Sequence, residues 1–336
     1  MILFIIILIL FFVFIIINLE YYNNFHEYLN HNLYKLPGND IIPEYLDYNI
    51  IKKGKSIASN SSIVICILAR NISKMFYKSS QRLEYIGNKF KNYKIIIFEN
   101  DSNDDSRNLF KQWKNHNKNV ILLNCHIIGN YDCKLNNKEG YDYGTISKNR
   151  FLKMAFYREQ YLNYIKENYF NYDYMLVYDS DLDGNINING LYDTLAHDDW
   201  SAVFVNGKIP CFLSFGLIDI NADVIASLFM DDNYDNIKYD FPTLLNQLYK
   251  LQYNRFNNHF LQVKSAFSGC GIYKIKDILD CSYIGDNNIC EHINLAKCLY
   301  NKNKKLYINY LWEFNFNIQG PTPYKTLKDF FNNSFN

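Results

Sequence analysis

Two aspartates separated by one residue, Asp179 and Asp181, give the strongest chemical indication in the sequence. They follow an apolar run at 174–178, which is typical of a strand buried inside a parallel sheet. In open α/β sheets, ligands bind beyond the carboxyl ends of the strands. Two carboxylates placed there need a positive partner, and Mg²⁺ or Mn²⁺ supplies one while sharing oxygen ligands with a diphosphate. The pattern therefore predicts a cation site, with an acidic turn that binds nothing as the alternative.

A second acidic segment, 99–105, follows another apolar run at 93–98. Carboxylates at this position can accept hydrogen bonds from ribose hydroxyls or from a base N–H. Part of the segment is typical of a helix cap, because Asp and Ser are preferred there. Capping does not readily account for Glu99 and Asp101, so we expect these two side chains to approach a nucleoside.

Three arginines are candidates for binding phosphate. Arg70 follows a first apolar run at 63–69, where a guanidinium can hold phosphate in a fork geometry. Arg150 and Arg158 are eight residues apart on one predicted helix and therefore lie on nearly the same face. Arg150 and Arg158 either offset the acids or contact the diphosphate. The alternatives are a structural salt bridge for Arg70 and a solvated helix face for the other two.

A segment toward the C-terminus combines small residues with an acid and an imidazole. Gly269 and Gly271 permit close approach of the backbone to a ligand, and Glu291 and His292 follow at a predicted helix start. Glu291 is a candidate general base, and His292 is a candidate further metal ligand. A lone histidine is more often structural, and that alternative stays open.

The elements that must position these residues alternate between strand and helix. Buried strands are predicted at 63–69, 93–98, 120–123 and 174–178, with further strands at 201–205 and 212–218. Helices are predicted up to about 91, at about 105–115 and at about 147–167, and a long loop is predicted at 126–145. This alternation predicts a mostly parallel sheet with helices on both faces.

The N-terminus is an unbroken apolar run over residues 1–17, close to the lower length limit for crossing a bilayer. No Lys or Arg precedes it and no small-residue cleavage site follows, which favours an uncleaved signal anchor over a cleaved signal peptide. We predict a transmembrane anchor at 1–18, a stem without sustained periodicity at 19–61, and one catalytic domain at 62–336.

Composition excludes a general attraction to nucleic acid. The 35 Lys+Arg and 34 Asp+Glu leave a net charge of +1, so any bound phosphate needs a local site. The 30 Tyr and 25 Phe accompany abundant Asn, Ile and Lys. Codon bias in an AT-rich genome, such as that of a protist or a large DNA virus, explains this better than a sugar-binding surface does.

The eight cysteines include no CxxC pair, which disfavours a zinc ribbon. If the body is lumenal, the candidate disulfides are the pairs close in sequence, Cys281 with Cys290 and Cys125 with Cys133. N-glycosylation sequons at Asn71 and Asn100 fall inside the acidic and basic motifs described above, so we expect neither to carry a glycan.

The order of these motifs resembles the cryptococcal capsule-associated mannosyltransferase family and related GT-A glycosyltransferases. The resemblance covers about residues 62–310 and rests on 69–71, 99–102, the Arg150…Ala155…Arg158 helix, 179–181, 267–273 and 290–292. It implies a GT-A fold, which is a mixed, mostly parallel sheet flanked by helices. It further implies a type II membrane topology, a nucleotide-sugar donor such as GDP-mannose, and a Mn²⁺ or Mg²⁺ requirement.

The same resemblance gives Asp179 and Asp181 the metal role and brings Glu99 and Asp101 to the nucleoside. Ser180, between the two aspartates, is a further candidate for contact with the donor. One departure is Glu159, where the family tends to have Asn after the arginine.

The expected activity is transfer of a sugar, with mannose as the family's sugar, to a glycan or glycoprotein acceptor. The alternatives are a metal-dependent nucleotidyltransferase or phosphohydrolase, and a non-catalytic lectin-like membrane protein on the same fold. The sequence has no Gly-rich P-loop and no His-rich two-metal set, and both aspartates are intact. The expected location is a membrane, in the Golgi or ER for a cellular protein, or in the host membrane or virion for a viral one.

Overall fold

The computed structural model describes residues 47–124, 148–180, 187–210, 217–218, 259–267, 269–285 and 290–315. The chain divides into two units, one comprising residues 42–209 with 219–336 and the other comprising 1–41 with 210–218. We call the first unit the body. Strand β6 (Leu217–Ile218) belongs to the other unit.

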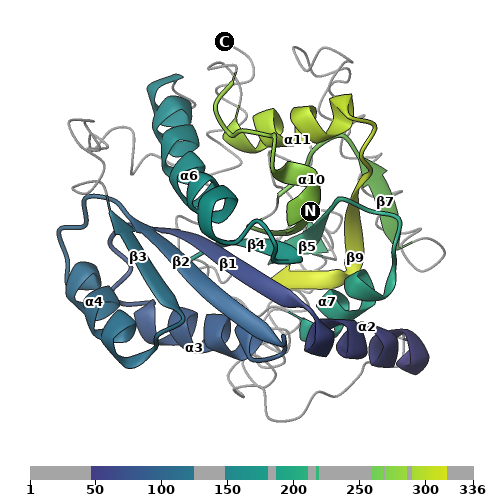
Figure 1. Cartoon of the computed structure of the whole chain (residues 1–336), viewed down its shortest axis with the longest axis horizontal. Helices are drawn as coiled ribbons and strands as arrows, with labels where there is room; N and C mark the ends of the chain where they lie inside the picture. Colours follow the sequence, from purple (N-terminus) through teal and green to yellow (C-terminus); the bar gives the residue numbers. More distant parts are fainter. Residues whose placement is uncertain are drawn as a thin grey trace, which may run out of the picture. The chain divides into compact units, whose positions relative to one another are not determined.

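A mixed sheet runs through the body (Figure 1) in the order β3-β2-β1-β4-β8-β5-β9-β7. Its strands are β1 (Ser62–Ala69), β2 (Asn92–Glu99), β3 (Val120–Asn124), β4 (Tyr174–Asp179), β5 (Ala202–Pro210), β7 (Phe260–Val263), β8 (Cys270–Lys274) and β9 (Leu306–Asn315). β1 pairs in parallel with β2 and β4, and β2 pairs in parallel with β3. Because β8 is antiparallel to both β4 and β5, the carboxyl ends of β1, β2, β4 and β5 share one edge.

Helices cover both faces of the sheet (Figure 1). α6 (Lys148–Asn168), α10 (Ile275–Ile278) and α11 (Glu291–Asn301) lie on one face, while α2 (Tyr48–Asn60), α3 (Phe76–Gly87), α4 (Ser106–His116) and α7 (Ile188–Ala196) lie on the other. The predicted mixed α/β architecture with flanking helices is thus what the body shows.

Strand β1 illustrates why a continuous apolar run is needed at the centre of this sheet. Ile63, Ile65 and Ile67 belong to the core on the α3 side, whereas Val64 and Cys66 belong to the core on the α6 side. Successive side chains of a strand point to opposite faces, so a strand covered on both faces must be apolar throughout. Fully burying each such aliphatic side chain contributes about 1.5–3 kcal/mol.

Helix α2 corrects part of the predicted stem. It begins after Asp47, whose carboxylate accepts a hydrogen bond from the backbone N–H of Asn49 at 2.7 Å. Its buried side, with Ile51, Gly54 and Ala58, packs on α7. The spacing of these three residues is typical of one face of a helix. It was overlooked because the segment 19–61 as a whole lacks sustained periodicity. The rest of the stem and the predicted anchor at 1–18 lie outside the described residues.

Within the part of the chain that the structure describes, no helix is both long and apolar enough to cross a bilayer. The predicted loop at 126–145 and most of the predicted strand at 212–218 lie outside that part. The boundaries of α4 and α6 agree with the sequence prediction to within one residue, while α3 ends at Gly87, earlier than expected.

The disulfide prediction was wrong for Cys281, which pairs with Cys298 and not with Cys290. The partner is 17 residues away in sequence, but α11 runs back beside the segment that follows α10 and brings the two Cα atoms to 5.7 Å. Proximity in sequence therefore favoured the wrong partner. Cys125 and Cys133 lie outside the described residues.

Candidate active site

The carboxyl edge of β1, β2 and β4 holds both predicted acidic segments. Asp179 ends β4 and is opposite Leu68 of β1, while Glu99 ends β2 and is opposite Ala69 of β1. The two acids therefore flank the end of β1 from either side. Both lie where open α/β sheets bind their ligands.

The turn after β4 is fixed by hydrogen bonds to its neighbours. The backbone N–H of Asp179 donates to the carbonyl of Gly269 at 2.9 Å, and the hydroxyl of Ser180 donates to the carbonyl of Leu68 at 2.6 Å. Ser180 is buried, so its described contact serves the turn and not a donor. The side chain of Asp179 keeps 31% exposure, which leaves it accessible from solvent. Asp181 lies outside the described residues.

Arg158 of α6 connects this turn to the C-terminal part of the body. Its side chain is only 3% exposed; Nη2 lies 3.2 Å from Asp179 Oδ1, and Nε lies 2.9 Å from Glu291 Oε1. Nη1 donates to the hydroxyl of Tyr161 at 3.3 Å, and the guanidinium lies 5.1 Å from the ring centre of Phe267. These contacts fit the expectation that Arg158 offsets the acids, and contact with the diphosphate of a donor stays a prediction.

Glu291 and His292 are the first two residues of α11, and Glu291 contacts Arg158. Glu291 is buried, and its Oε2 accepts a hydrogen bond from the thiol of Cys290 at 3.4 Å. The His292 ring stacks on Phe267 with centroids 3.6 Å apart. Burial, followed by the charge of Arg158, lowers the pKa of His292 well below its usual value, so the imidazole is neutral at pH 7. Among the described residues, its buried Nδ1 has no hydrogen-bond partner.

The role of His292 as a metal ligand beside Asp179 and Asp181 stays a prediction, because Asp181 lies outside the described residues. In the described part of the chain, His292 Nε2 lies 3.6 Å from Glu291 Oε1. The guanidinium of Arg158 is the positive charge that bridges Asp179 and Glu291.

Glu99, predicted to approach the nucleoside, is engaged within its own loop. It is 1% exposed, accepts a hydrogen bond from the backbone N–H of Ser102 at 2.8 Å, and pairs with Arg107 Nε at 3.0 Å. These contacts fix the turn after β2. Arg107 is thus a partner that the sequence analysis missed, eight residues beyond Glu99 in the first turn of α4.

The loops that follow β1 and β2 are joined by hydrogen bonds. The backbone N–H of Asn71 donates to Ser102 Oγ at 3.1 Å, and the side-chain oxygen of Asn71 accepts from the backbone N–H of Asn103 at 2.8 Å. Asp104 accepts from the backbone N–H of Ser73 at 3.0 Å. Desolvation opposes ionisation of Asp104, but hydrogen bonds from Ser106 and Ser73 outweigh it and lower its pKa to about 2. These hydrogen bonds hold the two loops together beside the end of β1.

Three further predicted site residues are described, and their roles stay predictions. Asp101 is half-buried with φ of 54°, a left-handed conformation that Asp tolerates better than most residues do. Arg70 is half-buried directly after β1, and Arg150 is half-buried in the first turn of α6. Asn100 is 3% exposed, in keeping with the expectation that its sequon carries no glycan.

Glu159, where the sequence departs from the resembled family, joins two segments of this chain through hydrogen bonds. Its Oε2 accepts hydrogen bonds from the backbone N–H of Tyr283 at 2.7 Å and from the hydroxyl of Ser282 at 2.9 Å. The carboxylate therefore ties α6 to the segment that precedes α11. Sequence reasoning could not find these contacts, because the two partners are 123 and 124 residues away from Glu159.

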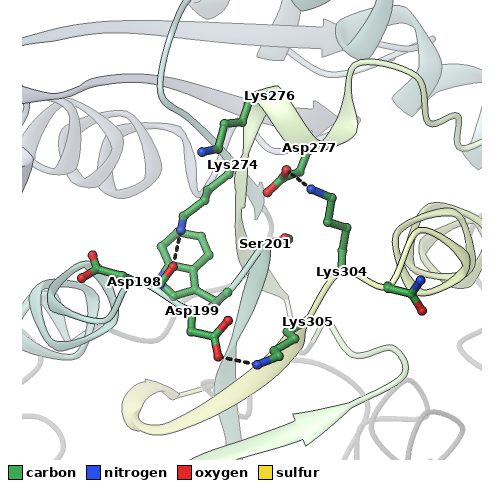
Figure 2. A pocket seen from close by; sticks show the side chains of 10 residues that line it. Asp198, Asp199, Ser201, Lys274, Lys276, Asp277, Lys304 and Lys305 are labelled. Carbon is green, nitrogen blue, oxygen red and sulfur yellow. Dashed lines mark hydrogen bonds and ion pairs between the residues drawn. The ribbon is translucent and has the colours of Figure 1, made fainter.

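A pocket opens at the opposite edge of the sheet, where β5 and β9 begin and β8 ends (Figure 2). Its lining is strongly charged, and three of its four lysines have described partners. Lys304 pairs with Asp277 at 2.7 Å, Lys305 pairs with Asp199, and Lys274 donates to the backbone carbonyl of Asp198 at 2.7 Å. Because Lys304 and Lys305 are paired with carboxylates and the pocket lies at the edge opposite the β4 turn, we do not assign the donor to this pocket.

No protein-family model matches the chain, and no curated protein sequence matches it. Among solved structures, it is similar to the mannosyltransferase PcManGT from Pyrobaculum calidifontis in complex with GDP-mannose and Mn²⁺, with 7% identity and a TM-score of 0.44 over 77% of this chain. It is also similar to TarS from S. aureus, with 12% identity and a TM-score of 0.42 over 81% of this chain. The chain spans 57% and 38% of these two proteins.

Proposed function

We propose that this chain is a metal-dependent glycosyltransferase that moves a sugar from a nucleotide-sugar to a glycan or glycoprotein acceptor. The observation that carries the proposal is the end of β4, where Asp179 is held in place at the ligand-binding edge with its carboxylate partly exposed. The motif order that resembles GT-A enzymes favours sugar transfer over other reactions of diphosphates.

Asp179 and Asp181 are the residues that would hold Mn²⁺ or Mg²⁺, since both ions favour carboxylate oxygens. The bound ion would stabilise the negative charge of the departing diphosphate. A carboxylate offers about four lone-pair sites, so the hydrogen bond from Arg158 is compatible with metal coordination by Asp179. Arg158 acts as a positioning residue that fixes the orientation of the carboxylate.

In the proposed reaction, an acceptor hydroxyl oxygen bonds to the anomeric carbon as the bond from that carbon to the diphosphate oxygen breaks. The nucleoside diphosphate leaves with the electron pair, and the hydroxyl proton passes to a base. Glu291 was our candidate for that base. Its burial and its 2.9 Å contact with Arg158 support a different role, in which it positions Arg158.

Mannose as the sugar, and a type II membrane attachment through residues 1–18, are finer parts of the proposal. The first is supported by the resemblance to the capsule-associated mannosyltransferases. The second is supported by the apolar run at the N-terminus. A Golgi, ER, host-membrane or virion location would follow from that anchor and from the source of the chain.

The proposal is tested by a donor screen on the purified full chain. Thermal shift with a panel of nucleotide-sugars, each with and without Mn²⁺, identifies the donor, because a ligand that binds the native state raises its melting temperature. Radiolabelled donor then measures transfer and hydrolysis. We expect both to require Mn²⁺ or Mg²⁺ and to disappear in Asp181→Ala, while the control Asp105→Asn, an exposed position at the start of α4, keeps them.

The other outcomes identify the alternatives. Synthesis of a nucleotide-sugar from a sugar phosphate would make the chain a nucleotidyltransferase. Glycan binding without turnover of any donor would make it a lectin-like protein. Either result would overturn the transferase proposal.

A further inference from the structure

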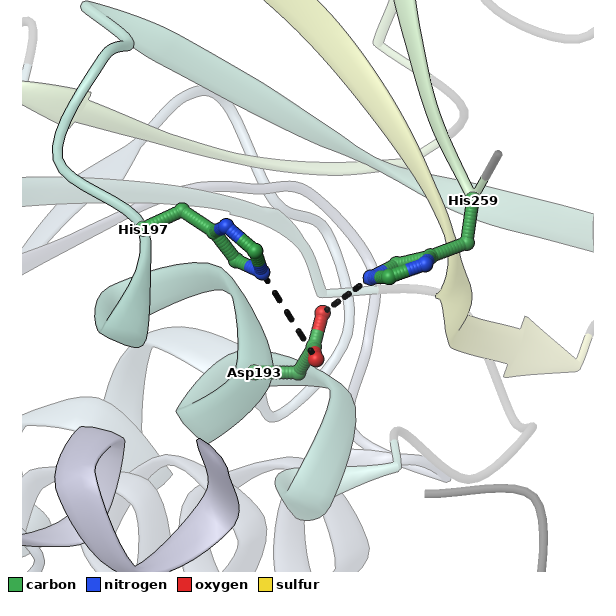
Figure 3. A group of neighbouring side chains, drawn as sticks. All are labelled: Asp193, His197 and His259. Carbon is green, nitrogen blue, oxygen red and sulfur yellow. Dashed lines mark hydrogen bonds and ion pairs between the residues drawn. The ribbon is translucent and has the colours of Figure 1, made fainter. Parts of the chain in front are cut away.

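A second group of possible ligands lies on the α7 face of the sheet, opposite the face that α6 covers (Figure 1). Asp193 is on α7, His197 directly follows that helix, and His259 directly precedes β7. Figure 3 shows both imidazoles turned toward the same carboxylate from different sides. His259 Nε2 lies 3.1 Å from Asp193 Oδ2, and His197 Nε2 lies 3.9 Å from Asp193 Oδ1.

The Asp193 carboxylate is buried and needs a positive partner. Its side chain is 3% exposed, and the described contacts are the two imidazoles and the side-chain amide of Asn309, which donates to Oδ2 at 2.9 Å. None of these described contacts comes from a Lys or an Arg. An ionised carboxylate removed from water is costly unless it is paired. A protonated imidazole or a bound cation would supply that positive charge.

The ring of His197 faces the carboxylate without a hydrogen bond to it. At 3.9 Å its Nε2 is too far from the carboxylate for a hydrogen bond, and this buried atom has no hydrogen-bond partner among the described residues. A buried ring nitrogen in this position is placed as a metal ligand would be.

The spacing of the three ligand atoms fits a metal ion. All lie within 4.8 Å of one another. Two ligands that are each about 2.1 Å from one ion lie no more than about 4.2 Å apart, so a small inward shift of the side chains closes the site. Asn309 would hold the carboxylate as an outer partner, the usual arrangement at metal sites.

We propose that Asp193, His197 and His259 bind a divalent transition-metal ion of the Zn²⁺ class, which links α7 to the start of β7. Two imidazoles and one carboxylate suit Zn²⁺, Fe²⁺ or Co²⁺, whereas Mg²⁺ and Mn²⁺ favour all-oxygen sites. The site is therefore chemically distinct from the proposed donor site at Asp179, and it does not depend on the proposed function.

Co²⁺ is the probe that tests this site, because its visible absorption reports the coordination of a bound ion. The purified full chain, stripped with a chelator and dialysed, should bind one equivalent of Co²⁺ that Zn²⁺ displaces. His197→Gln and His259→Gln should each weaken Co²⁺ binding by more than about 100-fold, since each removes a direct ligand and even losing an outer partner costs about 10–100-fold. The matched control His116→Gln, an exposed position on α4, should bind Co²⁺ normally.

Asp179→Asn should also bind Co²⁺ normally, which separates this site from the donor site. Far-UV circular dichroism checks that each variant is folded, and the titration of the unmodified chain remains decisive if one is not. No Co²⁺ or Zn²⁺ bound by the unmodified chain, or binding that both histidine variants retain, would overturn the proposal. The imidazoles would then serve only as hydrogen-bonding partners of Asp193.

Discussion

The two acidic clusters of the body differ in what neutralises their carboxylates. At the β4 edge, Asp179 and Glu291 share the guanidinium of Arg158. This guanidinium stays charged at every physiological pH. On the α7 face, Asp193 meets two imidazoles, whose charge depends on protons and which can bind metals. The first arrangement is suited to holding a site in place, and the second is suited to exchanging its cation.

The comparison predicts the largest loss of stability at Arg158. Arg158→Met would leave Glu291 buried without its counter-charge, so the free energy of unfolding should fall by about 3–5 kcal/mol. Urea denaturation of the full chain measures the change. The control is Arg150→Lys, at a half-buried position of the same helix, and we expect it to change stability by less than about 0.5 kcal/mol. A loss below about 1 kcal/mol in Arg158→Met would contradict the positioning role.

Glu291→Gln separates a positioning residue from a general base. As a base, Glu291 would support a rate enhancement of about 10²–10⁴, and the variant would lose the corresponding limb of the pH–rate profile. As the partner of Arg158, it should lower stability by about 1–3 kcal/mol and keep the shape of that profile. The two measurements together decide between the roles, because only a base changes the profile.

Acid should destabilise the β4 edge through His292. Its folded-state pKa lies below the ordinary value of 6.5, so the unfolded chain binds more protons as the pH falls below 6.5. Stability is therefore retained above pH 6.5 and declines below it, with a slope of at most about 1.4 kcal/mol per pH unit from this group. His292→Gln should reduce the slope of unfolding free energy against pH between about 6.5 and 5. An unchanged slope would show that His292 is not the responsible group.

The smallest stability effect is expected at Asp193 in metal-free protein. Asp193→Asn removes a buried charge while keeping a side chain that can hydrogen-bond to Asn309 and His259, so the change should stay within about 1 kcal/mol. Adding Zn²⁺ should stabilise the unmodified chain and leave the variant unaffected. Equal stabilisation of both would mean that Zn²⁺ binds elsewhere.

The sequence predicted the parts of the β4 edge that depend on local patterns. The apolar run before the two aspartates correctly predicted that Asp179 lies at the end of a buried strand. The predicted helix at about 147–167 correctly put Arg158 on a helix, α6. It could not predict the contact of Arg158 with Glu291, because 133 residues separate them and no periodicity links them. For the same reason it could not predict the hydrogen bond from Ser180 to Leu68, 112 residues away in sequence. The contact of Glu99 and of Ser180 with the donor stays a prediction.

The α7 face was less predictable still. Asp193 and His197 are four residues apart at the end of a short helix, a pattern too common to indicate a site. Their partner His259 arrives from a distant strand, and only the pairing of β7 with β9 brings it close. Helix α2, which packs on α7, lies in the segment 19–61, whose overall lack of sustained periodicity concealed the short apolar repeat of Ile51, Gly54 and Ala58.

The most direct test of the central claim is the metal dependence of donor turnover at the end of β4. Rates of nucleotide-sugar consumption should be compared for the unmodified chain, Asp179→Asn and Asp181→Asn, each with Mn²⁺ and with EDTA. The account predicts that EDTA or either substitution reduces turnover by more than about 100-fold while the folded state persists. Turnover that continues at the same rate in EDTA, or in both variants, would contradict it.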